Sequence, residues 1–383
     1  MWFLSPDVHH LNHGSFGAVP VPVQEERARW LARWEQEPTR FIFSGEVQTA
    51  LDGAREVVAR FVGASPDGFA FVRNTTSGVA AVVRSLEPFL REGDEMVTTN
   101  HAYNAVRQTM EFSASRTGAR VRVADVPLPI DDPVRVTAAV VEAVTDRTRL
   151  VVIDHISSPT GLVFPVEDIV GRLEPDVPVL IDGAHAPGQV PLDLDGIGAS
   201  WYTGNLHKWV CAPRGAGFLV TRSDRLSDTY PAVISHAWQM EAGPQRYRAL
   251  FDWLGTDDMS PWLAAPEAIR VVGAIRPGGW PEVMRTNHEL AIAARDLLCE
   301  VLGVDPIAPD WMTGSMAAIR LPDLEADPAL GLSPLTAQLM AAGFEAVVGF
   351  WPEPPNQLLR ISAHQYNTIE EYEALSHVLI GPE

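Results

Sequence analysis

The sequence predicts an α/β protein whose larger domain is built on a mostly parallel, seven-stranded sheet. Through the first 220 residues, short apolar segments with strand character alternate with segments of helical periodicity. This order is typical of a parallel sheet that is covered by helices on both faces. Later in the chain, long helices and a few strands indicate a smaller α+β domain. At 383 residues the chain exceeds the usual size of one hydrophobic core, so two domains are expected.

Before the sheet, residues 1–20 carry repeated glycines and prolines and are predicted to form an arm that packs with the small domain. Helices are expected over 23–36 and 48–62. Residues 21–265 are assigned to the large domain, with loops expected from 221 to its end. The seven strands are predicted at 69–72, 95–99, 120–123, 150–153, 177–181, 200–202 and 217–220.

The small domain is assigned to residues 266–383. Its first element is a long helix predicted over 281–302. The last helix is expected to begin at Thr368, because Glu370 and Glu371 then lie in its first turn, near the positive end of the helix dipole. Between them we expect a strand at 316–321, a helix at 334–342, and strands at 345–348 and 358–362.

Charge and composition exclude several classes of protein. A net charge of −20 and an isoelectric point near 4.9 argue against nucleic acid or an anionic membrane as the main partner. Two cysteines cannot build a disulfide scaffold and indicate a reducing compartment. The N-terminus lacks the pattern of a signal peptide, and no apolar run reaches the roughly 20 residues that span a bilayer. We therefore expect a cytoplasmic globular protein, and no metal site is predicted.

The chain contains a single lysine, Lys208, among 29 Lys and Arg residues. A lysine amine can lose its proton and condense with a carbonyl group, whereas a guanidinium stays charged. Retention of one lysine therefore suggests covalent chemistry. Taken alone, chance survival in a lysine-poor chain explains it equally well.

Two groups of polar residues follow predicted strands, where ligands of open α/β sheets bind. Thr75 and Thr76 begin a helix after the first strand, which suits either a phosphate or ordinary helix capping. Asp182 ends a buried strand, and a protonated pyridine nitrogen would satisfy its carboxylate; a turn aspartate is the alternative. His185 follows three residues later and can pack beside a ring or be a loop histidine.

Two further groups complete the set. Asn205 and His207 lie beside Lys208 and can donate hydrogen bonds to a phosphate, while Lys208 itself can form an imine with an aldehyde cofactor. Arg360 lies inside an apolar strand of the small domain. Its partner is either a substrate carboxylate or a structural carboxylate of the protein.

Five motifs in this order resemble the class V aminotransferases, which are fold-type I enzymes dependent on pyridoxal 5′-phosphate (PLP). The likeness is greatest to the branch typified by isopenicillin N epimerase, and it extends from residue 11 to about residue 375. The motifs are Leu11–Gly17, Asp182–Gly188, His207–Trp209, Gly255–Asp258 with Pro261–Ala264, and Leu359–Ala363.

The resemblance implies a role for each candidate near the cofactor. Lys208 would carry the internal aldimine and shuttle the Cα proton, Asp182 would pair with the pyridinium nitrogen, and His185 would lie near the ring. Ser158 stands where cysteine desulfurases have an asparagine that contacts the cofactor, so it is included as a cofactor ligand. The remaining implied ligands bind the phosphate: Thr75, Thr76, Asn205, His207 and, from the neighbouring subunit of a homodimer, Thr256.

On the substrate side, the resemblance implies that Arg360 binds the carboxylate of a small-molecule amino-acid substrate. Either His101 or Tyr103 would stack on the ring opposite Lys208, and the sequence leaves this choice open. The residues implied near the substrate from the arm are Asn12, Gly14 and Ser15.

The expected reaction is epimerisation at Cα through a quinonoid carbanion, with Lys208 on one face and His101 or Tyr103 on the other. C–S lysis by β-elimination and amino transfer remain alternatives on the same scaffold. Residues 347–357 contain no cysteine, so a persulfide-forming desulfurase is not expected. A non-enzymatic or nucleotide-binding α/β protein is disfavoured, because Lys208 is present and residues 69–78 hold only one glycine.

Overall fold

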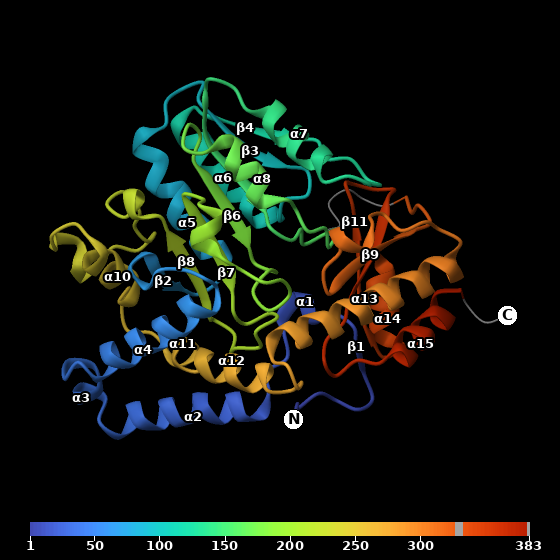
Figure 1. Cartoon of the computed structure of the whole chain (residues 1–383), viewed down its shortest axis with the longest axis horizontal. Coiled ribbons are helices and arrows are strands. Elements are labelled where there is room, and N and C mark those ends of the chain that lie inside the picture. Colours follow the sequence, from blue (N-terminus) through green and yellow to red (C-terminus); the bar gives the residue numbers. More distant parts are fainter. Residues whose placement is uncertain (326–331, 381–383) are drawn as a thin grey trace.

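The computed structural model describes residues 1–325 and 332–380. At its centre lies a seven-stranded sheet in the order β2-β8-β7-β6-β5-β3-β4 (Figure 1). The pairs from β4 through β3, β5 and β6 to β7 are parallel, whereas β8 is antiparallel to β7 and β2. The predicted fold class is confirmed. The strands are β2 (Phe69–Val72), β3 (Glu95–Thr99), β4 (Arg120–Ala124), β5 (Thr148–Asp154), β6 (Val179–Gly183), β7 (Trp201–Asn205) and β8 (Gly217–Thr221).

Both faces of this sheet are covered, which explains why its central strands are continuously apolar. In β2, Ala70 and Val72 face one hydrophobic cluster, and Phe69 and Phe71 face the other. Helices α5 (Thr75–Leu86), α6 (Asn104–Thr117) and α10 (Pro244–Asp252) contribute to the first cluster. Helices α4 (Glu46–Phe61), α7 (Val134–Ala143), α8 (Val166–Leu173) and α12 (Ala265–Gly273) contribute to the second.

A second, three-stranded antiparallel sheet lies in the C-terminal part, in the order β11-β12-β9. Its cluster of buried residues includes side chains from the long helix α13 and from α15. The expected order of helices and strands in this region is found. The elements are α13 (Trp280–Leu302), β9 (Met316–Leu321), α14 (Pro334–Ala341), β10 (Phe344–Glu345), β11 (Val347–Phe350), β12 (Gln357–Ser362) and α15 (Ile369–Ile380).

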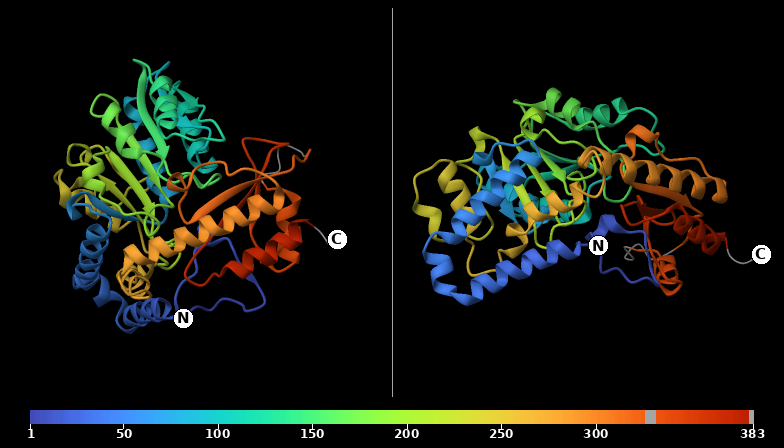
Figure 2. Two further views of the ribbon diagram at one scale, coloured as in Figure 1. Left: turned by 45° about the vertical axis from the view of Figure 1, so that its right-hand side comes forward. Right: turned by 60° about the horizontal axis from the view of Figure 1, so that its bottom comes forward.

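The N-terminal arm runs beside the C-terminal elements (Figure 2). Its strand β1 (His9–His10) pairs in parallel with β10, and Leu11 is fully buried in the cluster around α13. The arm is not extended throughout, because residues His13–Phe16 form the short helix α1. From its end the chain enters helices α2 (Val21–Gln36) and α3 (Pro38–Phe43).

The loops predicted after residue 221 are partly wrong, since α10, α11 (Ser260–Leu263) and α12 form there. Helix α12 packs against α2 and α4 and belongs with the large sheet. We therefore propose to move the domain boundary from residue 265 to the turn between α12 and α13. None of the helices in the described ranges combines the length and hydropathy needed to cross a membrane.

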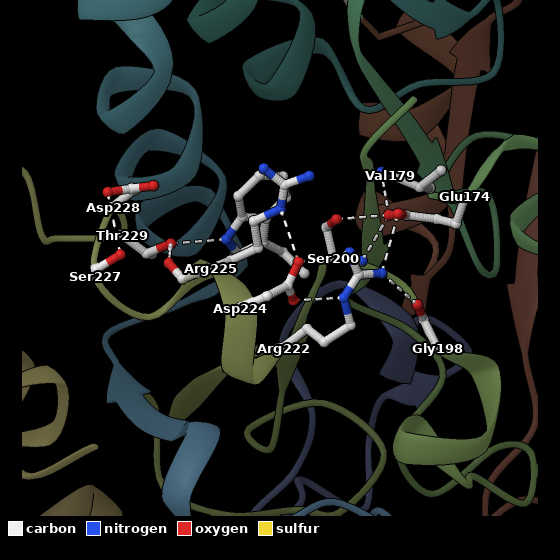
Figure 3. Close-up of polar contacts among 11 residues, drawn as sticks. Glu174, Val179, Gly198, Ser200, Arg222, Asp224, Arg225, Ser227, Asp228 and Thr229 are labelled. Atoms are coloured by element: carbon white, nitrogen blue, oxygen red, sulfur yellow. Dashed lines mark hydrogen bonds and ion pairs between the residues drawn. The ribbon is translucent and has the colours of Figure 1, made fainter. Parts of the chain in front are cut away.

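At the amino ends of β6 and β7, the carboxylate of Glu174 ties the two strands together (Figure 3). It accepts hydrogen bonds from the backbone N–H groups of Val179 and Ser200 and from the Ser200 hydroxyl. Arg222 forms an ion pair with the same carboxylate at 3.0 Å. At this end of the sheet the buried carboxylate already has a cation and three donors of the protein itself, which indicates a structural role.

Candidate active site

The carboxyl ends of β5, β6 and β7 bring polar residues to one edge of the sheet. Asp154 and Asp182 are register partners on β5 and β6, and Asn205 ends β7. The amide oxygen of Asn205 accepts a hydrogen bond from the backbone N–H of Thr75 at 2.9 Å. This contact places the first turn of α5 against the same edge, so Thr75 and Asn205, two of the predicted phosphate residues, lie together there.

Asp182 is only 3% exposed, although it carries a carboxylate. One oxygen accepts a hydrogen bond from the backbone N–H of Ala184 at 2.9 Å. Burial raises the pKa of Asp182, and the hydrogen bond from Ala184 and the charge of Lys208 oppose that rise. A cationic group bound beside this carboxylate would stabilise its ionised form.

Lys208 points its amine at His185, with 2.9 Å between Nζ and Nε2. Trp209 can only donate from its indole N–H, and it lies 3.4 Å from Nδ1 of His185. That contact makes Nδ1 the acceptor, so Nε2 carries the ring proton and donates to the lone pair of Lys208. Burial lowers the pKa of Lys208 to about 7, with Asp182 opposing the shift. A substantial fraction, about half, of the only lysine is therefore an uncharged nucleophile at neutral pH.

The first turn of α5 has an unsatisfied hydroxyl. The Oγ1 atom of Thr75 is buried and has no hydrogen-bond partner among the described residues. Thr76 is half-buried beside it. His207 contacts the carbonyl of Ala216 through Nδ1 at 3.0 Å, which leaves its Nε2 for another partner. Helix N-termini favour anions, and these groups suit a phosphate.

Arg360, on β12, is 9% exposed, and its polar partners in the described ranges are all neutral oxygens. Nη1 donates to the carbonyl of Ser158 at 2.7 Å and to its hydroxyl at 3.2 Å. Nη2 donates to Oδ1 of Asn12 at 3.0 Å and to Oγ of Ser15 at 2.6 Å. Burial lowers the pKa of Arg360 to about 10. A carboxylate ligand would supply the anion that this buried cation lacks.

The structure separates His101 from Tyr103. His101 is fully buried, with Nδ1 bonded to Thr160 Oγ1 at 2.9 Å and Nε2 bonded to the carbonyl of Val126 at 3.0 Å. Burial lowers the pKa of His101 to about 4. Tyr103 precedes α6 and is 48% exposed. The two hydrogen bonds that occupy the nitrogens of His101 have no counterpart at the Tyr103 hydroxyl among the described residues.

Thr256 and Ser158 were both predicted as cofactor ligands, and their surroundings differ from those of the other candidates. Thr256 is exposed on the loop before α11. Ser158 contacts Arg360, on the expected substrate side of the site. Sequence reasoning missed Asp154, which is 3% exposed beside Asp182. An aspartate that ends the apolar run Leu150–Ile153 was the available signal.

Residues 19–375 match the family model of the class V aminotransferases, so the chain belongs to this family. It is a PLP-dependent enzyme of fold type I, as the motifs predicted. A relative that is 34% identical over 390 residues is the isopenicillin N epimerase of Streptomyces clavuligerus, with 98% of this chain and 95% of the relative covered.

Other relatives carry out different chemistry. A probable chloroplastic L-cysteine desulfhydrase of Arabidopsis thaliana is 29% identical over 406 residues, which cover 98% of this chain and 83% of the relative. Among solved structures, a complex of the cystine C–S lyase C-DES with its product cysteine persulfide superposes with a TM-score of 0.79. The two sequences are 20% identical, and 98% of this chain and 99% of that chain are covered. This last likeness concerns the fold alone.

The residues of the site fit PLP. The orphaned hydroxyl of Thr75 lies where a phosphate would accept its hydrogen bond, and the buried carboxylate of Asp182 would face a pyridinium nitrogen. The uncharged amine of Lys208 would bind the aldehyde carbon. Thr75, Asp182 and Lys208 would thus each form a bond or contact with the cofactor that they do not form within the protein.

Proposed function

We propose that the protein is an amino-acid epimerase that exchanges the proton at Cα of its substrate. The observation that carries this proposal is a buried lysine, held by His185 at 2.9 Å, in a site whose buried arginine has only neutral partners among the described residues. Bound PLP supplies an electron sink that stabilises negative charge at Cα. Reaction specificity then depends on which protein groups reach that carbon.

Each residue has a separate task in this proposal. The fork of Arg360 binds the substrate carboxylate, and Asn12 and Ser15 hold that fork in place. Lys208 removes the Cα proton on one face. His185 donates a hydrogen bond to the lysine amine and keeps its lone pair directed.

Tyr103 is the acid that we propose for the opposite face. It precedes α6 at the carboxyl edge of the sheet and remains half-exposed. It is also close enough to Arg360 to influence its pKa. His101 is less suited to proton transfer, because both of its nitrogens are engaged and the ring is buried. We therefore favour Tyr103 over His101 as the second catalytic group.

C–S lysis by β-elimination is the second candidate. It is favoured because the hydrogen bonds of His101 occupy both of its nitrogens and leave it unsuited to proton transfer. With that residue engaged, only Tyr103 serves the second face, while elimination needs Lys208 alone. Desulfhydrases among the relatives support this alternative. Sulfur transfer through a protein persulfide is disfavoured, because both cysteines of the chain, Cys211 and Cys299, are buried and burial raises the pKa of each thiol.

Incubation of the PLP-loaded protein with L- and D-amino acids in deuterated water tests the proposal. We expect deuterium at Cα together with inversion of configuration, both lost in Lys208→Ala. Tyr103→Phe should retain exchange but lose inversion. Pyruvate and sulfide from cysteine would instead support lysis, and exchange without inversion by the native protein would rule out the epimerase.

We also propose a homodimer in which Thr256 reaches the phosphate of the partner subunit. The exposure of Thr256, which leaves its hydroxyl accessible to a second subunit, supports this arrangement. Mixed dimers of Lys208→Ala and Thr256→Ala subunits contain one site with both residues intact. They should bind PLP more tightly than Thr256→Ala dimers. A monomer in solution, or mixed dimers no better than Thr256→Ala, would contradict the shared site.

A further inference from the structure

The arm segment Asn12–Gly17 lies between the strand that carries Arg360 and the turn that carries Lys208. On the arginine side, Asn12 and Ser15 accept hydrogen bonds from the same guanidinium nitrogen. The hydroxyl of Ser15 also donates to Oδ1 of Asn12 at 2.8 Å, which fixes both acceptors. One side of the segment is thereby tied to the proposed carboxylate-binding residue.

The other side of the segment contacts the lysine turn in two places. His13 lies with Nε2 at 3.1 Å from the carbonyl oxygen of Lys208. Gly17 has a φ of +67°, and a Cβ built there would lie 2.2 Å from the carbonyl oxygen of His207 and 2.7 Å from that of Lys208. A side chain at this position would collide with backbone, so glycine permits the close approach.

The hydrogen bonds of His13 define its tautomer. The Lys208 carbonyl can only accept, so Nε2 carries the proton and Nδ1 accepts from the hydroxyl of Tyr366 at 2.8 Å. The ring of His364 stacks on His13 at 3.9 Å between centroids and 13° between planes. Burial lowers the pKa of His13 to about 3, which keeps it neutral. The side chain is therefore a fixed, uncharged donor.

His13, Cys211 and His364 also bring three possible metal-ligating atoms within 4.8 Å of one another. Two nearly parallel stacked rings cannot both direct an in-plane lone pair at one ion. The Nε2 atom of His13 moreover has no lone pair to offer while it donates to Lys208. The geometry suits packing and hydrogen bonding around the lysine turn better than metal coordination.

We propose that the segment Asn12–Gly17 is a brace that sets the distance between the Arg360 guanidinium and the Lys208 amine, with His13 as the positioning residue on the lysine side. This inference rests on the proposed function, in which those two groups act on one substrate. His13 touches the lysine backbone and no reacting atom, so it acts through the placement of Lys208. A displacement of about 1 Å at a reacting group can cost about 10²-fold in rate.

The test compares His13→Leu, which removes the donor, with His13→Gln, whose amide N–H can replace it. In His13→Leu we expect kcat to fall by about 10²-fold while KM changes by less than about threefold, because Arg360 keeps its contacts. The rate at which cofactor-free protein captures PLP through Lys208 should fall as well. His13→Gln should recover most of both losses.

His9→Ala is the matched control, since His9 lies on the same arm with a side chain 41% exposed and contacts Glu371 instead of Lys208. Its kcat and capture rate should equal those of the native protein. Tyr366→Phe removes only the hydroxyl that fixes the His13 tautomer, and it should reproduce a smaller loss if His13→Leu does not fold.

Capture of PLP is measured without any amino acid, so it tests the brace even if the epimerase proposal fails. A slow His13→Leu and a normal His13→Gln would support the brace whichever reaction is found. A native capture rate in folded His13→Leu would overturn it. The proposal would also be overturned if the capture rate falls in parallel with thermal stability and His13→Gln does not restore it.

Discussion

Arg55 and Arg360 are both buried arginines, but they meet different partners. Arg55, on α4, is 1% exposed and holds Asp252 through Nη2 at 2.6 and 2.7 Å. It also donates to the carbonyl of Phe69. Arg360 is 9% exposed and donates to neutral oxygens from two separate segments, the arm and the loop that holds Ser158. One cation has its anion in the fold, and the other has no anionic partner among the described residues.

The presence or absence of an anionic partner in the fold distinguishes a buried arginine with a structural role from one that we propose binds a ligand. In a buried ion pair the two charges compensate each other, so removal of one partner destabilises the fold and neither charge is left to bind a ligand. Glu174 and Arg222 at the amino end of the sheet belong with Arg55 (Figure 3). A buried cation held by neutral acceptors keeps its charge available, at a cost in folding energy that ligand binding can offset. The two kinds of site should therefore respond oppositely to substitution.

The largest effect is expected for Lys208→Ala, which removes the proposed base at the functional edge. Activity should fall by about 10²–10⁴-fold, the usual contribution of a positioned proton-transfer group. Stability of the cofactor-free protein should not fall, because the lost amine was buried and its charged form disfavoured. Steady-state kinetics and urea unfolding measure the two. Activity within tenfold of the native protein would exclude Lys208 as the base.

Asp252→Asn should reveal the structural side of the comparison. It removes the buried carboxylate partner of Arg55 and leaves only the half-exposed carboxylate of Asp52 beside that charge. Breaking a buried pair costs up to about 3–5 kcal/mol of folding free energy. Activity per folded molecule should stay at the native level, because Arg55 and Asp252 touch no residue of the site. Urea unfolding with parallel kinetics checks both. If Asp252→Asn loses activity but not stability, Arg55 does not have the purely structural role that we assign to it.

Arg360→Gln should show the opposite response. Removing one member of a buried, hydrogen-bonded charge pair costs about 2–5 kcal/mol of binding, so KM for the amino acid should rise steeply. The free energy of unfolding should stay constant or increase, since an unpaired buried charge is removed. Amino-acid amides lack the carboxylate and serve as control substrates: native protein and variant should handle them alike. A variant that still prefers the free acid would show that Arg360 does not bind the carboxylate.

The smallest effect is a pH dependence. The pKa of Lys208 lies at about 7 in the folded, cofactor-free protein, below its ordinary value, because of burial. Below that pH the amine is protonated, so PLP capture should slow about tenfold for each pH unit and level off above it. Capture by an exposed lysine peptide should level off only near about pH 10.4. A native profile like that of the peptide would contradict the buried, uncharged amine.

The same shift has a consequence for stability with a defined sign. Between about pH 7 and the ordinary lysine value, the unfolded chain binds more protons at Lys208 than the folded chain does. Stability of the cofactor-free protein therefore gains from Lys208 as the pH rises through that window. Lys208→Met should remove this gain, which unfolding curves at several pH values can measure.

Much of the fold was readable because local pattern and tertiary structure agree. Strands buried on both faces read as continuous apolar runs, and the seven strands of the sheet were predicted in order. The helices α10 to α12 were missed, because their prolines and tryptophans resemble loop composition until one sees Trp262 packed on Phe71. The short helix α1 escaped for the same reason, since its glycine and serine are poor local helix formers.

The sequence by itself determined the family and the cofactor and predicted the lysine that would bind it, because these depend on motifs whose residue types and order suffice. Only the tertiary structure decided which groups are free to act. Asp154 lies beside Asp182 through strand pairing, His101 loses both nitrogens to Thr160 and Val126, and the arm joins Arg360 to Lys208. Partners of this kind come from distant segments, and their distances exist only once the chain has folded.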